Sequence, residues 1–386
     1  MALSIWMILT VIFSLFYYGL MLSYWWSWSR YPKTTIEKSD LKTKVTVIIP
    51  ARNEAHNILN ILNDLKAQTY DSILFETLVV DDSSTDDTVE LVEKYNFKNT
   101  RLIHLNTFFD ENGEPLTLKK KAIETAVSLA EGELIMVTDA DCRLPKNWIE
   151  LFVMVYQKEQ SALIAGPVIF NPAETVFEKF QALDFLGMMA ITVAYFRKNV
   201  FNMCNGSNLA YQKSAFLAVG GYKGIDHIAS GDDMLLIYKI AAQFPGKISY
   251  LKNEAAIVKT APERKMSDFL QQRFRWTSKS GAYQNKTITR DLGLVYLFNW
   301  IILINVFLFA FGFRSILVVF IPQLAFKVTV DFLLLFSATR FFKKRELMEV
   351  FIPSQFLHLI YIIIVGTLGN LIPYKWKGRR IKNEVE

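Results

Sequence analysis

Long apolar runs lie at both ends of the sequence, and a region that alternates short apolar and polar segments lies between them. Residues 1–29 contain no charged side chain, and the run Ala2–Tyr24 exceeds the roughly 20 residues needed to cross a bilayer. This pattern predicts an N-terminal transmembrane anchor at residues 1–29, about three transmembrane segments within residues 291–374, and a basic tail at residues 375–386. The three C-terminal runs are Leu292–Phe313, Ser315–Ala338 and Val350–Ile372.

The N-terminal run is interpreted as an uncleaved anchor. A secretory signal peptide would begin with positive charge and end at a small-residue cleavage site, and this sequence has neither feature. Instead, Trp25, Trp26 and Trp28 follow the run together with Arg30 and Lys33, which is the composition of a membrane interface. The positive charge beside the anchor predicts that the region after it lies in the cytosol.

Residues 44–290 alternate strand-like and helix-like segments. Short apolar runs at Lys44–Pro50, Thr77–Val80 and Leu134–Val137 predict buried strands, and helical spacing of apolar residues follows the first two. Repeated strand–turn–helix units predict α/β architecture with a parallel sheet. The carboxyl ends of these three strands are therefore expected to line one crevice, where a nucleotide would bind.

Polar residues in the first two turns predict how the helices start. Asn53 is predicted to cap the helix that carries Ile58 and Ile61. Ser84 with Asp87 resembles a capping box at the start of the next helix.

Two carboxylates follow the third predicted strand directly. Asp139 and Asp141 come just after Leu134–Val137, and alternate residues of extended chain point to the same side. Hard cations such as Mg²⁺ and Mn²⁺ favour oxygen ligands and share them with substrate phosphates. The sequence therefore predicts a metal site here, with two solvated loop acids as the alternative.

Composition and missing motifs narrow the function class. The net charge of +6 is concentrated near the membrane ends, which predicts contact with an anionic membrane face and not with nucleic acid. No G-x-G-x-x-G follows the first strand and no G-x-x-x-x-G-K-[ST] occurs, so a metal and basic side chains are expected to hold phosphates. The four histidines are scattered and are read as structural. Two cysteines, Cys142 and Cys204, offer no disulfide framework and suit a reducing cytosol.

Charged residues also occur inside the apolar regions. Lys327 and Asp331 are four residues apart in the second C-terminal run, so they are expected to pair on one helix face. Buried charges in membranes usually pair or face protein, and a structural pair is the simplest reading. The apolar stretch Val176–Val200 is either an interfacial helix or part of the core.

Two further clusters of polar residues have both a structural and a functional interpretation. Asp232 and Asp233 precede a helical run, where acids stabilise a helix N-terminus or supply a site. Arg273, Arg275 and Trp276 put two cations and an indole together, either for binding or for snorkelling at a membrane surface.

Taken together, these motifs resemble those of family 2 glycosyltransferases. The resemblance covers roughly residues 44–280 and is greatest to membrane-embedded, inverting members, which include cellulose and hyaluronan synthases. It implies a GT-A fold, a Rossmann-like α/β domain that binds nucleotide sugars, at residues 44–290 with flanking transmembrane helices. The motifs, in the order that the family has them, are Val45–Glu54, Asp81-Asp82-Ser83, Thr138-Asp139-Ala140-Asp141, Gly231-Asp232-Asp233 and Gln272–Trp276.

The resemblance implies roles for individual residues. Asp139 and Asp141 would hold Mg²⁺ or Mn²⁺, and Asp233, beside Asp232, would be the general base. Lys119 falls where the family often has a Gly-Lys pair, although Leu118 replaces the glycine. Residues expected to bind the donor are Ala51, Glu54, Asp82, Lys119 and Asp139, with Asp82 at the base. Residues expected at the acceptor and diphosphate are Gln272, Arg273, Arg275, Trp276 and Asn205.

With the membrane segments, the resemblance implies transfer with inversion from a nucleotide sugar, a UDP-sugar first, to a lipid or lipid-linked acceptor. Processive polysaccharide synthesis is the second reading, because the Gln272–Trp276 motif occurs in such synthases, although three C-terminal segments are few for a polymer channel. A non-catalytic scaffold would have lost metal or base acids, and all of them are present.

The basic residues near the apolar runs predict an integral membrane protein, interpreted as one of a bacterial inner membrane, with a cytosolic catalytic domain. An odd number of spans would then place the basic tail outside. Either one segment is interfacial, or the tail breaks the positive-inside rule.

Overall fold

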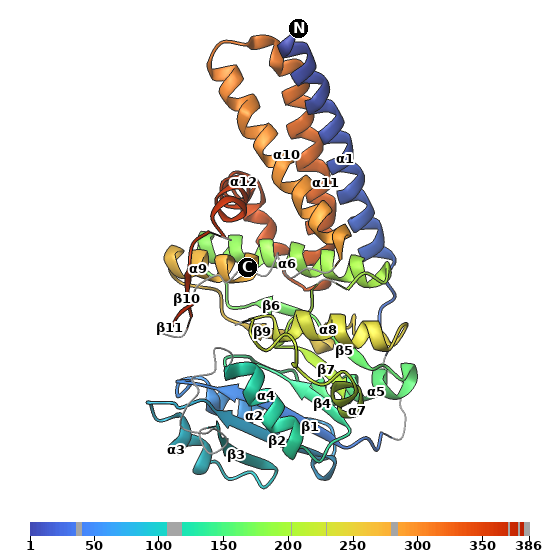
Figure 1. Ribbon diagram of the computed structural model, residues 1–386, viewed down its shortest axis with the longest axis vertical. Coiled ribbons are helices and arrows are strands. Elements are labelled where there is room, and N and C mark those ends of the chain that lie inside the picture. The colour runs from blue at the N-terminus through green and yellow to red at the C-terminus, as the bar shows by residue number, and fades with distance from the viewer. Residues whose placement is uncertain are drawn as a thin grey trace. The chain divides into compact units, whose positions relative to one another are not determined.

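The computed structural model describes residues 1–35, 41–105, 118–201, 203–228, 230–278, 285–369, 371–376 and 379–381. The chain divides into two compact units, each assembled from separate stretches of sequence. The sheet unit consists of Pro32–Pro172 and Met203–Ala261. The helical unit consists of Met1–Tyr31, Ala173–Asn202 and Pro262–Glu386. Figure 1 labels their elements.

A seven-stranded mixed sheet forms the centre of the sheet unit, in the order β3-β2-β1-β4-β7-β5-β8. The first four strands are parallel, as predicted, whereas β7 runs antiparallel to both of its neighbours. The strands are β1 (Val45–Ala51), β2 (Phe75–Asp81), β3 (Thr100–His104), β4 (Leu134–Val137), β5 (Leu163–Ala165), β7 (Leu209–Gln212) and β8 (Ile248–Tyr250).

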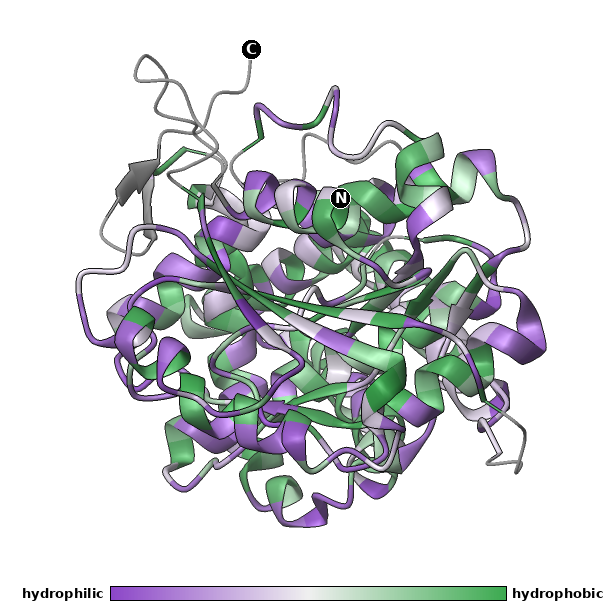
Figure 2. Cartoon of the chain, turned by 90° about the horizontal axis from the view of Figure 1, so that it is seen from below, coloured by the Kyte–Doolittle hydropathy of each residue, from purple (hydrophilic) through white to green (hydrophobic). Residues whose placement is uncertain are grey.

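Continuous apolar runs form the inner strands because helices cover both faces of such a sheet. All four residues of β4 are buried. Helix α2 buries Ile58, Ile61, Leu62 and Leu65, which share one face at helical spacing. Figure 2 shows the resulting alternation of hydrophobic and hydrophilic residues along the helices. The helices of this unit are α2 (Ile58–Lys66), α3 (Thr88–Glu93), α4 (Leu118–Leu129), α5 (Trp148–Glu159), α7 (Lys213–Ala218) and α8 (Asp232–Gln243), and a small second sheet pairs β6 (Val168–Phe170) with β9 (Val258–Thr260).

The predicted helix caps are wrong. Helix α2 starts after Asn57 and α3 starts after Asp87, and neither cap residue makes a side-chain hydrogen bond to its helix. Asn53 has a left-handed φ of 55°, and its Oδ1 accepts a 2.8 Å hydrogen bond from the Thr85 N–H. In return, the Asn53 N–H donates to the Ser84 hydroxyl at 2.9 Å. The polar side chains join the turns after β1 and β2 to each other, and so they are not available to cap helices.

The helical unit contains the predicted long apolar helices. Helices α1, α10 and α11 run side by side, and α6 crosses at one end and packs against α1, α11 and α12. Most of α6 is buried, including Leu186 and Val193. Among the described residues, four segments are long and apolar enough to cross a membrane: Ala2–Arg30, Lys286–Ala310, Arg314–Phe341 and Arg345–Leu368. The elements are α1 (Ala2–Arg30), α6 (Val176–Arg197), α9 (Met266–Thr277), α10 (Lys286–Ala310), α11 (Leu317–Phe341), α12 (Phe351–Leu368), β10 (Tyr374–Trp376) and β11 (Arg379–Ile381).

The predicted ion pair inside the second C-terminal run is present. The Lys327 ammonium lies 2.6 Å from Asp331, and both side chains are almost fully buried. Asp331 also accepts a 2.8 Å hydrogen bond from Tyr17 of α1, and Lys327 donates to Gln355 of α12. One buried pair on α11 therefore joins three helices.

Candidate active site

The turns that follow β1 and β2 lie next to each other at the carboxyl edge of the sheet. Ala51, the last residue of β1, is 2% exposed, and its carbonyl accepts a 2.9 Å hydrogen bond from the Asp82 N–H. The Asp82 carboxylate lies 3.4 Å from the Arg52 guanidinium. Glu54 donates its N–H to the Thr88 hydroxyl at 2.8 Å. The three residues expected at the nucleoside, Ala51, Glu54 and Asp82, are thus fixed in neighbouring turns.

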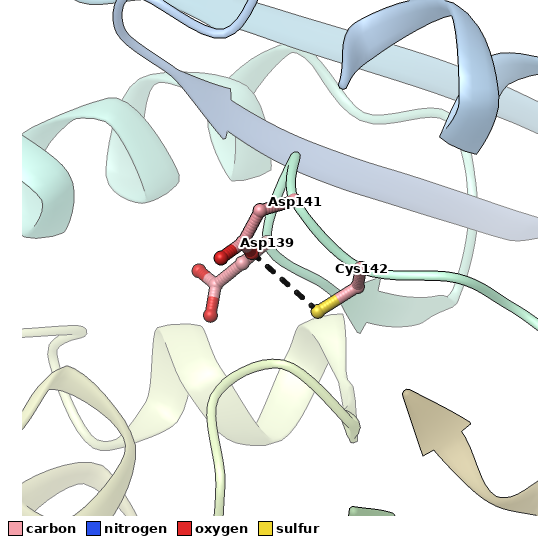
Figure 3. Close-up of side chains that lie close together, drawn as sticks. All are labelled: Asp139, Asp141 and Cys142. Carbon is pink, nitrogen blue, oxygen red and sulfur yellow. Dashed lines mark hydrogen bonds between the residues drawn. The ribbon is translucent and has the colours of Figure 1, made fainter. Parts of the chain in front are cut away.

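The D-x-D carboxylates follow β4, which pairs in parallel with β1 at the same edge. Figure 3 shows the side chains of Asp139 and Asp141 close together, with the Cys142 thiol beside them. One ligand atom from each of the three lies within 4.8 Å of the others. Asp141 also accepts a 3.4 Å hydrogen bond from the Thr260 hydroxyl.

The two carboxylates fit a hard divalent cation, and the thiol does not. Mg²⁺ and Mn²⁺ take oxygen ligands, and the Asp139 side chain is 37% exposed, which leaves room for a bridging phosphate. The Cys142 Sγ lies 3.7 Å from Asp141 Oδ1 and donates to it. Burial, followed by the charges of Asp141 and Asp139, raises the pKa of this thiol well above its usual range. Cys142 therefore remains a protonated donor that orients Asp141.

Lys119, in the first turn of α4, connects the D-x-D sequence to the acids of α8. Its ammonium lies 2.7 Å from Asp139 and 3.3 Å from Asp232. Burial alone would lower the pKa of Lys119, but the nearby carboxylate charges, Asp139 above all, outweigh burial and raise it above its ordinary value. The site therefore contains a permanent cation between two groups of acids.

The antiparallel strand β7 explains how the second group of acids reaches this edge. Leu209, the first residue of β7, pairs with Val137, the last residue of β4. The loop that contains Asn205 and Gly206 consequently enters the sheet where the D-x-D sequence leaves it. Within this loop, Asn205 Oδ1 accepts hydrogen bonds from the N–H and hydroxyl of Ser207.

Gly206 links this loop to the expected base. Its N–H donates a 2.8 Å hydrogen bond to one carboxylate oxygen of Asp233, and the Met234 N–H donates to the other at 2.7 Å. A Cβ at Gly206 would lie 3.3 Å from Asp232 Oδ2 and 3.5 Å from the Lys119 ammonium. A side chain at this position would therefore press on the Asp232 carboxylate and touch Lys119.

The Gln272–Trp276 residues lie on α9, in the helical unit. Arg273 is 3% exposed and lies 2.8 Å from Asp184 of α6, which is also buried. Its guanidinium stacks over the rings of Trp276 and Phe269, at 4.3 and 4.7 Å from their centroids. Arg275 is only partly buried, as are Gln272 and Trp276. Of the two arginines, Arg275 is the more accessible to a ligand.

Several residues of the site carry no sequence signal that we used. Asp184 is a lone acid within an apolar stretch, which is the pattern that marks a functional or paired charge in a membrane protein. Gly206 lies in the loop that contains Asn205, and Cys142 directly follows the D-x-D sequence, but only the fold shows what these two residues contact.

Matches to known protein families agree with this geometry. Residues 134–365, more than half of the chain, match the Glycosyl transferase family group 2, and residues 46–220 match Glycosyl transferase family 2. The chain belongs to glycosyltransferase family 2. It is therefore a glycosyltransferase, and the family resemblance inferred from the motifs is confirmed.

Two relatives in this glycosyltransferase family differ in how much of the chain they match. Poly(ribitol-phosphate) beta-N-acetylglucosaminyltransferase TarS of Staphylococcus aureus is 35% identical over 108 residues, which cover 28% of this chain and only 18% of TarS. Glucosyl-dolichyl phosphate glucuronosyltransferase of Haloferax volcanii is 22% identical over 274 residues, which cover 66% of this chain and 84% of that enzyme.

A solved structure has the same fold over nearly the whole chain. The mannosyltransferase PcManGT from Pyrobaculum calidifontis, in complex with GDP-Man and Mn²⁺, superposes with a TM-score of 0.58 at 18% sequence identity. The match covers 95% of this chain and 99% of PcManGT. The α/β sheet unit with its flanking apolar helices is thus the predicted GT-A architecture.

Proposed function

We propose that this glycosyltransferase is a membrane enzyme that transfers a sugar, with inversion, from a nucleotide sugar to a lipid or lipid-linked acceptor. The observation that carries the proposal is the arrangement around Lys119: donor-side acids Asp139 and Asp141 lie on one side of the ammonium, and Asp232 and Asp233 of α8 lie on the other. Separate acids for the leaving group and for the acceptor are what a direct displacement requires.

On the donor side, the residues bind and neutralise the nucleotide. Ala51, Glu54 and Asp82 would contact the nucleoside, with a UDP-sugar as the first candidate. Asp139 and Asp141 would hold Mg²⁺ or Mn²⁺, which when bound offsets the negative charge that develops on the diphosphate. The Lys119 ammonium would add positive charge to the same leaving group.

On the acceptor side, Asp233 takes the proton. A sugar or lipid hydroxyl has a high pKa, so a positioned carboxylate must accept its proton as the new glycosidic bond forms. Both Asp233 oxygens accept backbone hydrogen bonds, which fix the carboxylate in one orientation. Attack from the face opposite the diphosphate inverts the anomeric carbon. Asn205, in the loop that precedes β7, would shape the acceptor side.

The acceptor class is supported by the apolar helices and by one relative. The part of the chain that the structure describes contains four segments long and apolar enough to cross a membrane, which suits an acceptor that resides there. The relative from Haloferax volcanii is named for a dolichyl phosphate acceptor. The basic residues beside the apolar runs support a cytosolic catalytic unit, and we infer that it works at a bacterial inner membrane.

A polymer acceptor is the alternative, because TarS is named for poly(ribitol phosphate). Donor and acceptor can be tested together. Detergent-solubilised protein would be incubated with Mn²⁺ or Mg²⁺ and a panel of UDP- and GDP-sugars, followed by extraction of labelled product into organic solvent. We expect nucleoside diphosphate release and lipid-soluble product. Label that stays in a water-soluble polymer would favour the alternative, and no release from any donor would favour a non-catalytic scaffold.

A further inference from the structure

Three consecutive lysines open α4, and the structure gives each a different environment. Lys119 contacts the acids of the site, and Lys121 is exposed to solvent. Lys120, between them, is only 2% exposed. An ammonium is costly to bury unless polar groups surround it. The proposed chemistry gives Lys120 no role that would account for its burial.

The Lys120 ammonium is held by the backbone of the loop that leads to α8. Its Nζ donates to the carbonyl of Ile225 and, at 2.7 Å, to the carbonyl of Ile228. It also lies 6.0 Å from the ring centroid of Tyr222, which is 1% exposed. Lys120 therefore fixes both the middle and the end of this loop, residues 219–228.

This loop has little regular structure of its own. Gly220, Gly221 and Gly224 all have positive φ, between 52° and 85°, which no helix or strand provides. Side chains from the two flanking helices hold it instead. Glu124 of α4 accepts a 2.9 Å hydrogen bond from the Tyr222 N–H, and Lys239 of α8 donates to the carbonyls of Gly221 and Lys223.

The loop precedes the catalytic acids closely in the sequence. Ile228 lies four residues before Asp232, the first residue of α8, and Gly231, with a left-handed φ of 81°, is the N-cap of this helix. The neighbouring Lys119 contacts the Asp232 carboxylate itself at 3.3 Å. Two consecutive lysines of α4 thus contact Ile228 and Asp232, which lie four residues apart.

We propose that Lys120 is a positioning residue for sugar transfer: it holds the 219–228 loop so that Asp232 and Asp233 remain in place, without touching substrate. The proposal rests on the function proposed above for Asp233. Lys120 lies outside every functional motif, and the sequence alone does not distinguish it from Lys119 and Lys121.

The test compares Lys120→Met with Lys121→Met, which removes the same charge from the exposed neighbour. Binding of the nucleotide sugar that the wild type hydrolyses would be measured by calorimetry with Mn²⁺, and transfer would be expressed per donor-binding site. For Lys120→Met we expect an unchanged donor Kd and a kcat per binding site lowered by about 100-fold, the order expected for a misplaced catalytic group. Lys121→Met should match the wild type in both.

Two results would overturn the proposal. One is a Lys120→Met protein with fewer donor-binding sites but normal kcat per site, which is the signature of a purely structural residue. The other is normal behaviour in both measurements. If Lys120→Met yields no donor-binding protein, Lys239→Met, which releases the Gly221 and Lys223 carbonyls of the same loop, should show the kcat loss, and a normal kcat there contradicts the proposal. Asp233→Asn, measured in parallel, reports separately on the base: transfer by that variant would refute the proposed function and not the role of Lys120.

Discussion

The Lys119 ammonium lies 2.7 Å from Asp139, the first acid of the D-x-D sequence, and so occupies space beside a carboxylate that would also hold a divalent cation. A lysine in this position has two opposite effects. It repels a metal ion that binds alone, and it attracts the diphosphate of a donor.

We therefore expect Lys119→Met to change the two affinities in opposite directions. Without the ammonium, Mn²⁺ alone should bind several-fold more tightly, and the nucleotide sugar should bind about 10-fold more weakly, because a charge-assisted contact to phosphate is lost. Calorimetric titrations with Mn²⁺ alone and with donor plus Mn²⁺ measure both. Weaker binding of both ligands would show that Lys119 only maintains the local fold.

Asp233→Asn should abolish transfer and leave donor binding largely intact. The amide keeps the shape of the side chain but cannot accept the acceptor proton, so a loss of roughly 10²- to 10⁴-fold in kcat is expected. The measurement pairs transfer assays with donor calorimetry. Loss of donor affinity in this variant would assign Asp233 to the donor side instead.

Substitutions of the two arginines of α9, Arg273 and Arg275, should have different effects on stability and on kcat. Arg273→Met leaves the Asp184 carboxylate, 5% exposed, without its guanidinium, which we expect to cost about 3 kcal/mol of stability. Arg275 is only partly buried, so Arg275→Gln should lower the melting temperature in detergent less than Arg273→Met does, and kcat should fall by about 100-fold because the family resemblance assigns this arginine to the diphosphate. An Arg273→Met protein that melts normally but does not transfer would place Arg273 at the substrate.

Replacing one residue of the buried Lys327–Asp331 pair should destabilise the protein more than replacing both. Asp331→Asn leaves the Lys327 charge buried without its counter-ion, at an expected cost of about 3 kcal/mol, whereas Lys327→Met with Asp331→Leu should recover most of this loss. Glu349→Gln is the matched control, because it breaks the ion pair between Lys179 and Glu349, and the Glu349 side chain is 66% exposed. The loss of this exposed pair should lower the free energy of unfolding by less than about 1 kcal/mol. Thermal unfolding in detergent measures all three. Equal losses in the single and double variants would contradict the pairing argument.

Lys252 should make stability depend on pH. Burial, followed by the charge of Lys33, lowers the pKa of Lys252 from 10.5 to about 8. Below pH 8 both the folded and unfolded states are protonated. Between pH 8 and 10.5 the unfolded state binds more protons, so stability rises with pH by about 3 kcal/mol. Lys252→Met should lack this rise when unfolding is followed from pH 7 to 9.5, and parallel curves for the two proteins would contradict the prediction.

Part of the site could be predicted because its signals are local. The runs before Asp82 and Asp139 are continuous and apolar, and acids placed directly after such strands must emerge at the carboxyl edge of a parallel sheet. The caps predicted at Asn53 and Ser84 failed for a related reason. Their side chains reach a neighbouring turn that the sequence does not reveal as a neighbour.

Other parts depend on contacts between distant segments. Strand β7 has four residues and no distinctive pattern, and its antiparallel direction follows only from pairing with β4, more than 70 residues earlier. The sequence likewise gives no sign that Lys119, Lys120 and Lys121 differ in how deeply they are buried. Arg273 and Asp184 are 89 residues apart, so only the packing of α9 on α6 pairs them.

The division of the chain into two interleaved units has a practical consequence for protein production. Residues 173–202 lie in the middle of the sequence of the sheet unit but belong to the helical unit. A single fragment such as 32–261 would therefore carry α6 without α1, α11 and α12, and would expose side chains such as Leu186 and Val193 that the full chain buries. Such a fragment is expected to aggregate. A soluble version of the catalytic unit would need two segments, 32–172 and 203–261, joined by a short polar linker in place of the excised helix.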